Sequence, residues 1–399
     1  MKITGIKIIR RTIWFEPRYR AVARSCGPLD IWDEYNARGR ETVKNRAPDK
    51  GGGEVSGNFL VVTTDEGFEG CSGPVENRSE LLTAVDGLAQ HIVGRDPLNN
   101  RMIWDIMSRF DRHSRAGLMM MAISAVDIAI WDLKGKILGQ PVYRLLGGGR
   151  ERIRPYFSTL AFSLDIQEAT KMAKDIKALG VRAQKWFFRW GPAEGAEGMR
   201  KNLDLAFALR DAVGPDYELM FDCWMGWTVN YAKAAFRELE TVRPMWVEEV
   251  LRPHMLDGFR KLREETDIPL SSGEHFYTRM EVNQFLKDNI ISVMQSDPVW
   301  CGGITECLRI ADLCEMYGAT FIPHGHEMMS AMHIVATMPP DVSPYCEYLL
   351  CHMDRKNAFF KEKRLGEDGW LTINDTPGLG EEIDEERMIS AETVTEFKL

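Results

Sequence analysis

Three carboxylates follow short apolar runs that are typical of buried β-strands. Asp222 ends the run ELMFD, Glu248 follows MWV and Glu274 follows PLSSG. Each lies 26 residues from the next, about one strand–helix unit of a parallel α/β fold. Three negative charges held close together would repel one another unless a cation lay between them. All-oxygen ligands suit a hard ion, so the spacing predicts a Mg²⁺ site.

Acid–base groups end the later strand-like runs. Asp297 follows VMQS and His324 follows FIP. A carboxylate that faces an imidazole orients the ring and raises its basicity, so this pair is predicted to act as a general base. Glu347, in PYCEYL, is predicted to hydrogen-bond a substrate oxygen. A salt bridge, a helix cap or a surface charge is the alternative for any one of these residues.

Two other interpretations use the same sequence. His324 and His326 form a His-x-His pattern, which ligates zinc in other barrels, but there the pattern belongs on the first strand. The glycine runs at 147–149 and 302–303 could cradle a phosphate, yet neither has the context of a P-loop or a G-x-G-x-x-G motif. We therefore interpret the two glycine runs as turns.

The secondary structure expected around these residues follows a repeating order. From about residue 152, short β-rich runs alternate with amphipathic helices, which implies parallel strands and right-handed crossovers. The predicted strands are 154–160, 183–188, 218–222, 246–248, 270–273, 293–295, 319–322 and 345–349, with helices such as 166–179, 200–213 and 304–317. Eight such runs favour a closed α/β barrel, whose functional groups lie at the C-terminal ends of the strands.

The flanking segments predict a second domain. A strand at 3–13, a hairpin at 58–72 and helical patterning at 79–138 precede the barrel. The polar segment at about 14–60 is rich in arginine and ends in a glycine run, and it is predicted to be a specificity loop that orders over the barrel mouth. The predicted boundaries are a capping domain at 1–150, a barrel at 151–355 and an irregular tail at 356–399 that packs back on the capping domain.

Composition excludes several classes of partner. The chain has 399 residues, is 44% hydrophobic and carries a net charge of −9. Lys and Arg are scattered, so neither nucleic acid nor an anionic membrane is an expected partner. The longest apolar run, 118–126, is too short to span about 30 Å of hydrocarbon. Eight cysteines without a C-x-x-C pair are expected to be reduced and buried, which favours a cytoplasmic protein.

Taken in order, these residues resemble those of the enolase superfamily and its mandelate racemase subgroup. The run SAVDIAIWDLKGKILGQPVYRLLGG at 124–148 is similar to the segment before the barrel in that subgroup. The motifs FDCWM, VNYA, WVEE, SGEH, WCGGIT and PHG are similar to those of rhamnonate-dehydratase-like acid-sugar dehydratases. The resemblance implies an α/β fold with a (β/α)₇β barrel of the TIM type and an α+β capping domain formed from both termini.

The resemblance also implies roles for single residues. One Mg²⁺ per subunit would be held by Asp222, Glu248 and Glu274, and the proton α to a substrate carboxylate would be removed. Racemases of the subgroup carry Lys-x-Lys on the second barrel strand, whereas here that strand reads AQKWF and holds Lys185 alone. Lys185 matches either the first lysine, which pairs with the carboxylate, or the second, which acts as a base. Further candidates for substrate binding are His275, Trp224 and Arg20.

The predicted function is a Mg²⁺-dependent aldonate dehydratase. His324 would remove the C2 proton and the 3-hydroxyl would be eliminated, which gives a 2-keto-3-deoxy acid from an L-rhamnonate-like substrate. One alternative is an acid-sugar epimerase or racemase that uses His324 and Lys185 on opposite faces. Another is a catalytically silent barrel used for binding or assembly. A homo-oligomer is expected from the resemblance.

Overall fold

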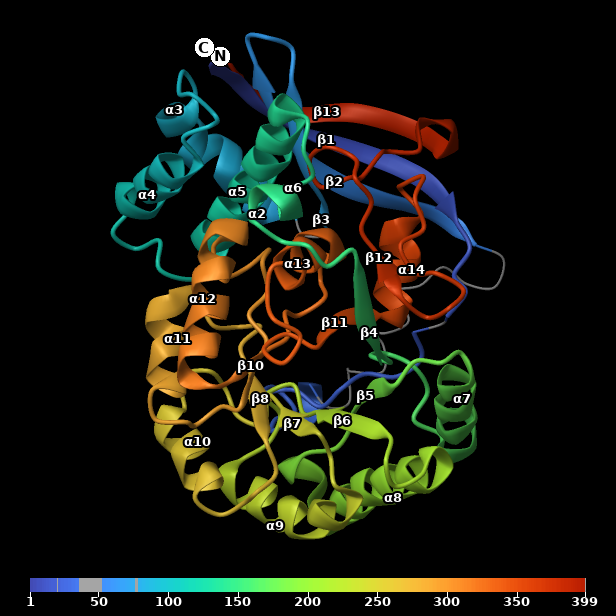
Figure 1. The fold of residues 1–399 in the computed structure, drawn as a ribbon. Coiled ribbons are helices and arrows are strands. Elements are labelled where there is room, and N and C mark those ends of the chain that lie inside the picture. Colours follow the sequence, from blue (N-terminus) through green and yellow to red (C-terminus); the bar gives the residue numbers. More distant parts are fainter. Residues whose placement is uncertain (20, 36–51, 76–77, 399) are drawn as a thin grey trace.

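The computed structural model of the chain describes residues 1–19, 21–35, 52–75 and 78–398. Figure 1 shows a capping domain, which holds both ends of the chain, above an α/β barrel. The elements of the capping domain are β1 (Ile3–Phe15), β2 (Gly53–Thr64), β3 (Glu69–Val75), α2 (Arg78–Thr83), α3 (Ala89–Ile92), α4 (Asn100–Phe110), α5 (Leu118–Leu138), α6 (Val142–Leu145) and β13 (Met388–Lys398).

The described strands of the capping domain form an antiparallel sheet in the order β13-β1-β2-β3. Alternate residues of β1 and β2, such as Ile6, Ile8 and Val62, point to one face and are buried against α5. The predicted hairpin is therefore confirmed. None of the described helices combines the length and the apolar character that crossing a bilayer requires.

The tail is not irregular throughout, as the sequence predicted, because part of it forms a strand. Residues 388–398 form β13, which pairs with β1, so that Arg10 lies opposite Glu392. Most side chains of β13 are exposed, and the strand reads MISAETVTEFK without a buried alternating face. Because no apolar alternation marks this strand, only its pairing with β1 reveals it. A helix, α14 (Leu350–Asn357), spans the predicted boundary between the barrel and the tail.

The barrel repeats strand and helix seven times and ends on a further strand. Its elements are β4 (Arg152–Ser158), α7 (Ile166–Ala178), β5 (Ala183–Phe187), α8 (Gly195–Val213), β6 (Glu218–Asp222), α9 (Val229–Leu239), β7 (Trp246–Glu248), α10 (Leu256–Arg263), β8 (Leu270–Ser272), α11 (Thr278–Leu286), β9 (Val293–Met294), α12 (Gly303–Tyr317), β10 (Thr320–Phe321), α13 (Met328–Val335) and β11 (Tyr345–Leu349). The predicted α/β class and the (β/α)₇β order are confirmed.

The parallel strands pair in the order β10-β9-β8-β7-β6-β5-β4-β11. In the described part of the chain, β10 and β11 meet without a strand ladder. Instead, the Gly325 N–H just after β10 donates to Glu347 Oε2 of β11 at 2.9 Å. A short strand β12 (Leu371–Thr372) from the tail pairs antiparallel with the start of β4.

One layer of side chains fills the barrel interior and sets the direction of the next layer. It consists of Tyr156, Ala183, Met220, Trp246, Val293, Ile322 and Tyr345. Side chains two residues apart along extended chain point to the same face. Five polar residues each lie two positions after a member of this layer, namely Lys185, Asp222, Glu248, His324 and Glu347. The barrel therefore places these polar side chains together at the C-terminal ends of its strands.

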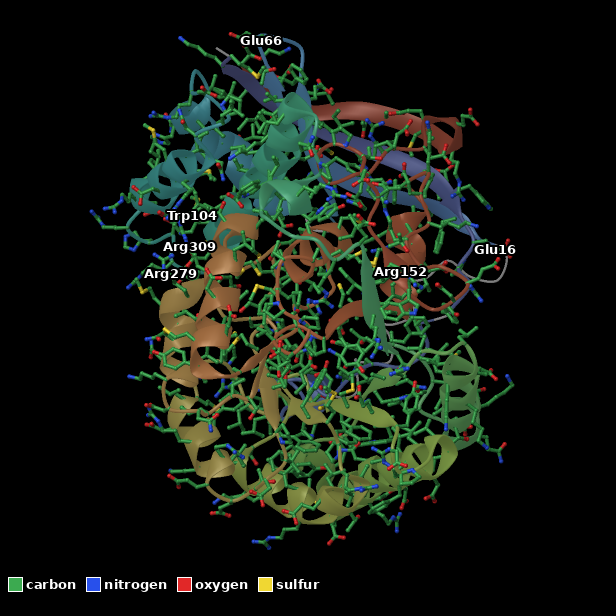
Figure 2. The ribbon with its side chains drawn as sticks, viewed as in Figure 1. Glu16, Glu66, Trp104, Arg152, Arg279 and Arg309 are labelled. Atoms are coloured by element: carbon green, nitrogen blue, oxygen red, sulfur yellow. The ribbon has the colours of Figure 1, made fainter. Side chains whose placement is uncertain are left out.

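The capping domain is fastened to the barrel through α4 and α12. The indole N–H of Trp104 donates to the Gly302 carbonyl oxygen at 2.7 Å, and the Arg309 guanidinium lies 4.8 Å from the Trp104 ring centroid. Glu306 is buried and pairs with both Arg309 and Arg279, at 2.8 and 2.5 Å. Figure 2 shows Trp104, Arg309 and Arg279 gathered at this boundary.

The predicted specificity loop is described in part, because residues 36–51 lie outside the described residues. Its segment 21–35 crosses the C-terminal ends of three neighbouring strands. The N–H groups of Val22 and Cys26 donate to the carbonyl oxygens of Ala161 and Phe188, both at 2.8 Å, and Cys26 Sγ contacts the Cys223 carbonyl oxygen at 2.9 Å. This segment therefore covers the barrel end where the polar layer lies.

His333 joins α13, α6 and the tail in its neutral form. Its Nδ1 accepts from the Tyr143 N–H at 3.0 Å, so Nε2 carries the proton and donates to the Leu379 carbonyl oxygen at 3.0 Å. Burial lowers the pKa of His333 to about 4, and the positive charge of Arg364 acts in the same direction. Protonation of Nδ1 would leave the Tyr143 N–H without its acceptor.

We expect His333 to make stability depend on pH. The unfolded chain takes up a proton at this residue below about pH 6.5, whereas the folded chain does so only near the lowered pKa of about 4. The stabilisation is thus complete above pH 6.5 and is lost as the pH falls toward 4. Between pH 7 and 4.5 the free energy of unfolding should fall by about 2–3 kcal/mol more in the native chain than in His333→Gln. Urea unfolding measures the free energy of unfolding of both proteins at each pH. An equal fall in the native chain and in His333→Gln would contradict the role assigned to His333.

Candidate functional site

The strand-end carboxylates share a buried ammonium group. Lys185 Nζ lies 2.5 Å from Glu248 Oε1, 2.8 Å from Glu347 Oε1 and 3.9 Å from Asp222 Oδ2. All four side chains are buried, and the β6–β7 register sets Asp222 directly beside Glu248. Burial alone would lower the pKa of Lys185, but these carboxylates outweigh it and raise that pKa well above the usual value. Lys185 therefore stays charged.

Negative charge at this end of the barrel exceeds what Lys185 can balance. Burial is the largest cause that raises the pKa of Asp222 to about 7, of Glu248 to about 8 and of Glu274 to about 7, and neighbouring carboxylates add to each rise. Glu249 is also buried here, and its Oε2 has no hydrogen-bond partner among the residues that the structure describes. A group of buried acids with uncompensated charge is the donor set that a divalent cation requires.

The residues present therefore fit a Mg²⁺ ion. Because one ammonium lies within 3.9 Å of both Asp222 and Glu248, a single cation can approach both carboxylates. Among the described residues, the group whose ligand atoms all lie within 4.8 Å of one another is Glu249, Glu274 and His275. It shares only Glu274 with the predicted ligand set of Asp222, Glu248 and Glu274.

His324 and Asp297 form a buried pair on the opposite side of Glu347 from Lys185. His324 Nδ1 lies 2.5 Å from Asp297 Oδ2, and Asp297 Oδ1 accepts from the Val299 N–H at 2.7 Å. With Nδ1 engaged, Nε2 faces the site, 3.3 Å from Glu274 Oε2 and 3.8 Å from Glu347 Oε2. Burial would lower the pKa of His324, but Glu274, Glu347 and Asp297 together raise it to about 10.

Glu347 is held between the two cationic groups. Burial would raise its pKa, but Lys185 and His324 outweigh burial and lower that pKa to about 2. Its Oε2 also accepts from the Gly325 N–H. Glu347 therefore stays ionised and can accept a hydrogen bond from a substrate.

The predicted substrate-binding residues have different surroundings. His275 Nδ1 lies 2.9 Å from Glu249 Oε1 and 3.4 Å from Glu274 Oε1, and 26% of its side chain is exposed. Trp224 is 40% exposed, and its ring lies against Gly27 of the segment that crosses the barrel end. Both can therefore be reached from the mouth. Arg20 lies outside the described residues.

Local backbone strain also marks this end of the barrel. Trp224, Met225 and Glu249 have φ angles of +37°, +61° and +44°. Residues other than glycine rarely have positive φ angles, and those that do are often found at functional sites. All three follow strands β6 and β7 directly.

The structure adds three residues that the spacing of the sequence did not single out. Glu249 orients His275, and the Trp246 indole N–H donates to Glu248 Oε2 at 2.9 Å. The Trp300 ring stacks on His275 and on His324, with centroids 5.5 and 5.2 Å apart. The WVEE and WCGGIT motifs contain these residues, but no spacing rule assigns them a partner.

Two protein families match parts of this chain. Residues 53–147 match the family described as "Mandelate racemase / muconate lactonizing enzyme, N-terminal domain", and residues 167–387 match "Enolase C-terminal domain-like". A protein of Saccharopolyspora erythraea named L-rhamnonate dehydratase is 34% identical over 82% of this chain and 83% of its own. One of Agrobacterium fabrum named D-galactarolactone cycloisomerase is 30% identical over 86% of this chain and 91% of its own.

A solved structure is similar over nearly the whole chain. The crystal structure of rhamnonate dehydratase from Gibberella zeae complexed with Mg superposes with a TM-score of 0.80 at 25% identity. The match covers 97% of this chain and 96% of that chain. The likeness therefore includes the capping domain as well as the barrel.

Proposed function

This chain belongs to the enolase superfamily, and we propose that it is a Mg²⁺-dependent hydro-lyase that dehydrates an acid sugar. The reaction removes the proton at C2 of an aldonate and eliminates the 3-hydroxyl as water. The enol that remains gains a proton at C3 and loses the one on its C2 hydroxyl, which gives a 2-keto-3-deoxy acid. The observation that carries the proposal is the buried His324–Asp297 pair. The Nε2 atom of His324 faces Glu274 and Glu347, and Glu347 in turn contacts Lys185. The relatives named as dehydratases support the same reaction class.

Asp222, Glu248 and Glu274 would hold the Mg²⁺. The chemistry that Mg²⁺ would supply here is positive charge, which neutralises the acids that now keep a proton on His324 and stabilises negative charge that develops on the substrate carboxylate. The ammonium of Lys185 would pair with that same carboxylate. The two interactions together orient C2 toward His324.

His324 carries both proton transfers. Asp297 holds Nδ1, so Nε2 takes the C2 proton. The imidazolium that results then donates this proton to the leaving 3-hydroxyl, which departs as water. Glu347 would accept a hydrogen bond from the enediol oxygen, and His275 and Trp224 would contact the rest of the sugar chain at the mouth.

The substrate is proposed to be an L-rhamnonate-like aldonate, because proteins named for that substrate are among the similar ones. A screen of an acid-sugar library for 2-keto acids, run with Mg²⁺ and again after chelation, tests this. We expect a 2-keto-3-deoxy acid from L-rhamnonate or a stereoisomer, and none after chelation. A product that keeps its 3-hydroxyl but has inverted C2 would instead show an epimerase that uses Lys185 and His324.

Gly325 tests the geometry of the proposed base. A Cβ on Gly325 would lie 2.6 Å from the Glu347 carbonyl oxygen and 3.0 Å from Glu347 Cβ, closer than packed atoms allow. Gly325→Ala should therefore push His324 away from the substrate and lower kcat by about 10²-fold. Steady-state kinetics measures this in protein shown to be folded by circular dichroism.

Gly149→Ala is the matched control, because a Cβ on Gly149 meets none of the described atoms within 4 Å. We expect this variant to keep native kcat. If Gly325→Ala also kept native kcat, the close approach of the chain after β10 to β11 would have no part in placing His324.

A further inference from the structure

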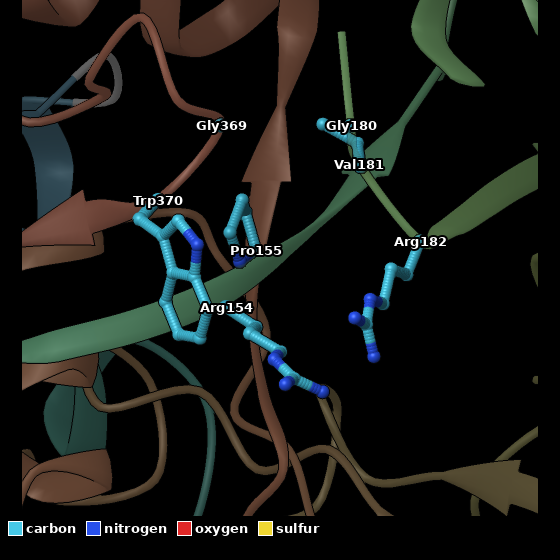
Figure 3. A pocket seen from close by; sticks show the side chains of 7 residues that line it. All are labelled: Arg154, Pro155, Gly180, Val181, Arg182, Gly369 and Trp370. Carbon is cyan, nitrogen blue, oxygen red and sulfur yellow. The ribbon is translucent and has the colours of Figure 1, made fainter. Parts of the chain in front are cut away.

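A pocket lies at the end of the barrel strands opposite the candidate site. It has a volume of about 110 Å³ and is formed by the start of β4, the turn between α7 and β5, and the tail loop before β12. The residues that line it are Arg154, Pro155, Gly180, Val181, Arg182, Gly369 and Trp370 (Figure 3). None of these residues takes part in the proposed reaction.

The position of Arg154 separates this pocket from the catalytic layer. Arg154 precedes the interior residue Tyr156 by two positions, whereas the catalytic side chains follow their interior residues by two. Arg154 and the catalytic side chains are therefore four residues apart along the strand direction. At about 3.3 Å per residue, this separation is about 13 Å. The pocket therefore opens at the N-terminal end of the barrel.

The walls of the pocket are held by the backbone. Gly369 has φ +75°, and a Cβ there would lie 3.0 Å from the Leu179 carbonyl oxygen, so the tail loop fits closely against the turn after α7 only with glycine. The next residue, Trp370, donates its N–H to Asp368 Oδ1 at 3.2 Å, and Leu371 then pairs with Ile153 of β4. These backbone contacts on both sides of Trp370 fix its position in the pocket wall.

Two arginines of this pocket have no acidic partner in the described part of the chain. The Trp370 ring lies 4.8 Å from the Arg152 guanidinium and 5.1 Å from that of Arg154. Asp368 pairs with Arg152. Neither Arg154 nor Arg182 makes an ion pair or a side-chain hydrogen bond with any residue that the structure describes.

The acid that begins the neighbouring strand β6 is also engaged. Glu218 accepts the hydroxyl hydrogen bond of Tyr345, and both Arg154 and Arg182 act electrostatically on that same hydroxyl. Figure 3 shows the Arg154 side chain extending from β4 and the Arg182 side chain extending from the turn before β5 toward the same space. Two positive charges that converge without an acid between them repel each other unless an anion binds.

We propose that Arg154 and Arg182 together bind one small oxyanion, a carboxylate or a phosphate-like group, in this pocket. The planar guanidinium matches two oxygens of such a group, and charge-assisted hydrogen bonds of this kind are the strong ones. A cavity of about 150 Å³ can hold a molecule the size of benzene, so this pocket of about 110 Å³ has room for a small oxyanion group. The site is independent of the proposed dehydration.

Calorimetric titration of the Mg²⁺-loaded protein tests the proposal. The probes are sulfate, as a tetrahedral oxyanion, and acetate, as a carboxylate, at constant ionic strength set with NaCl. We expect one saturable site, and the tighter of the two probes identifies the ligand class. Arg154→Gln and Arg182→Gln should each weaken binding by about 10-fold or more, because each removes a charged hydrogen-bond donor.

Two controls make the outcome decisive. Arg237→Gln removes an exposed arginine of α9 outside the pocket and should leave binding unchanged. Arg182 is exposed, so its variant should fold even if Arg154→Gln does not. Binding that persists in both pocket variants but is lost in Lys185→Met would place the anion at the catalytic end and overturn the proposal. Binding that does not saturate would also overturn it.

Discussion

His324→Asn is expected to lower kcat for dehydration by about 10²–10⁴-fold or more, because the same imidazole takes the C2 proton and returns it to the leaving hydroxyl. The variant should also lose exchange of the C2 proton with solvent. Asparagine keeps a polar side chain of similar reach beside Asp297, so the fold should survive. Proton NMR in D₂O follows the exchange, and a coupled assay for 2-keto acids follows the product.

Lys185→Met is the companion variant, because it separates the two possible roles of Lys185. If the ammonium binds the substrate carboxylate, the variant should raise KM strongly yet keep some C2 exchange at saturating substrate. If Lys185 is the base, exchange should disappear while the substrate still binds. The second result would disprove the mechanism in which one histidine carries both protons.

Glu248→Gln is expected to abolish turnover and to weaken Mg²⁺ binding by more than about 10²-fold, since even partners outside the ligand set contribute about 10–100-fold. The side chain touches Lys185 and Trp246 and is fully buried, so the amide fits the same space. Calorimetric titration with Mg²⁺ measures the affinity without relying on activity. Asp222→Asn and Glu274→Gln should behave in the same way.

Glu249→Gln is the matched control for this experiment. Glu249 is adjacent in the chain and equally buried, but it pairs with His275 rather than Lys185. We expect it to change Mg²⁺ affinity by no more than about 10-fold. If Glu249→Gln abolished Mg²⁺ binding and Glu248→Gln did not, the ligand set would be Glu249, Glu274 and His275 instead.

Much of the barrel could be predicted because its sequence signals are local. Each strand is a short apolar run, and a parallel barrel brings the ends of all its strands to one place. The equal spacing of Asp222, Glu248 and Glu274 therefore predicts that they meet. In the structure Asp222 and Glu248 share Lys185, whereas the contacts of Glu274 are with His275 and His324. The edge strand β13 could not be predicted in this way, because a polar strand that is exposed on most of its length carries no alternating pattern.

The residue types at the ends of the barrel strands, and with them the acid–base and metal chemistry proposed for the protein, can be read from the sequence alone. How those residues pair depends on the folded chain. Lys185 meets Glu248 across 63 positions, and the His275–Glu249 and His324–Asp297 contacts span 26 and 27. Local sequence patterns report how one segment is buried, but a contact between side chains of different strands depends on register and rotamer, which packing sets. The Arg154–Arg182 pocket exists for the same reason, because β4, the turn before β5 and the tail meet only in the folded chain.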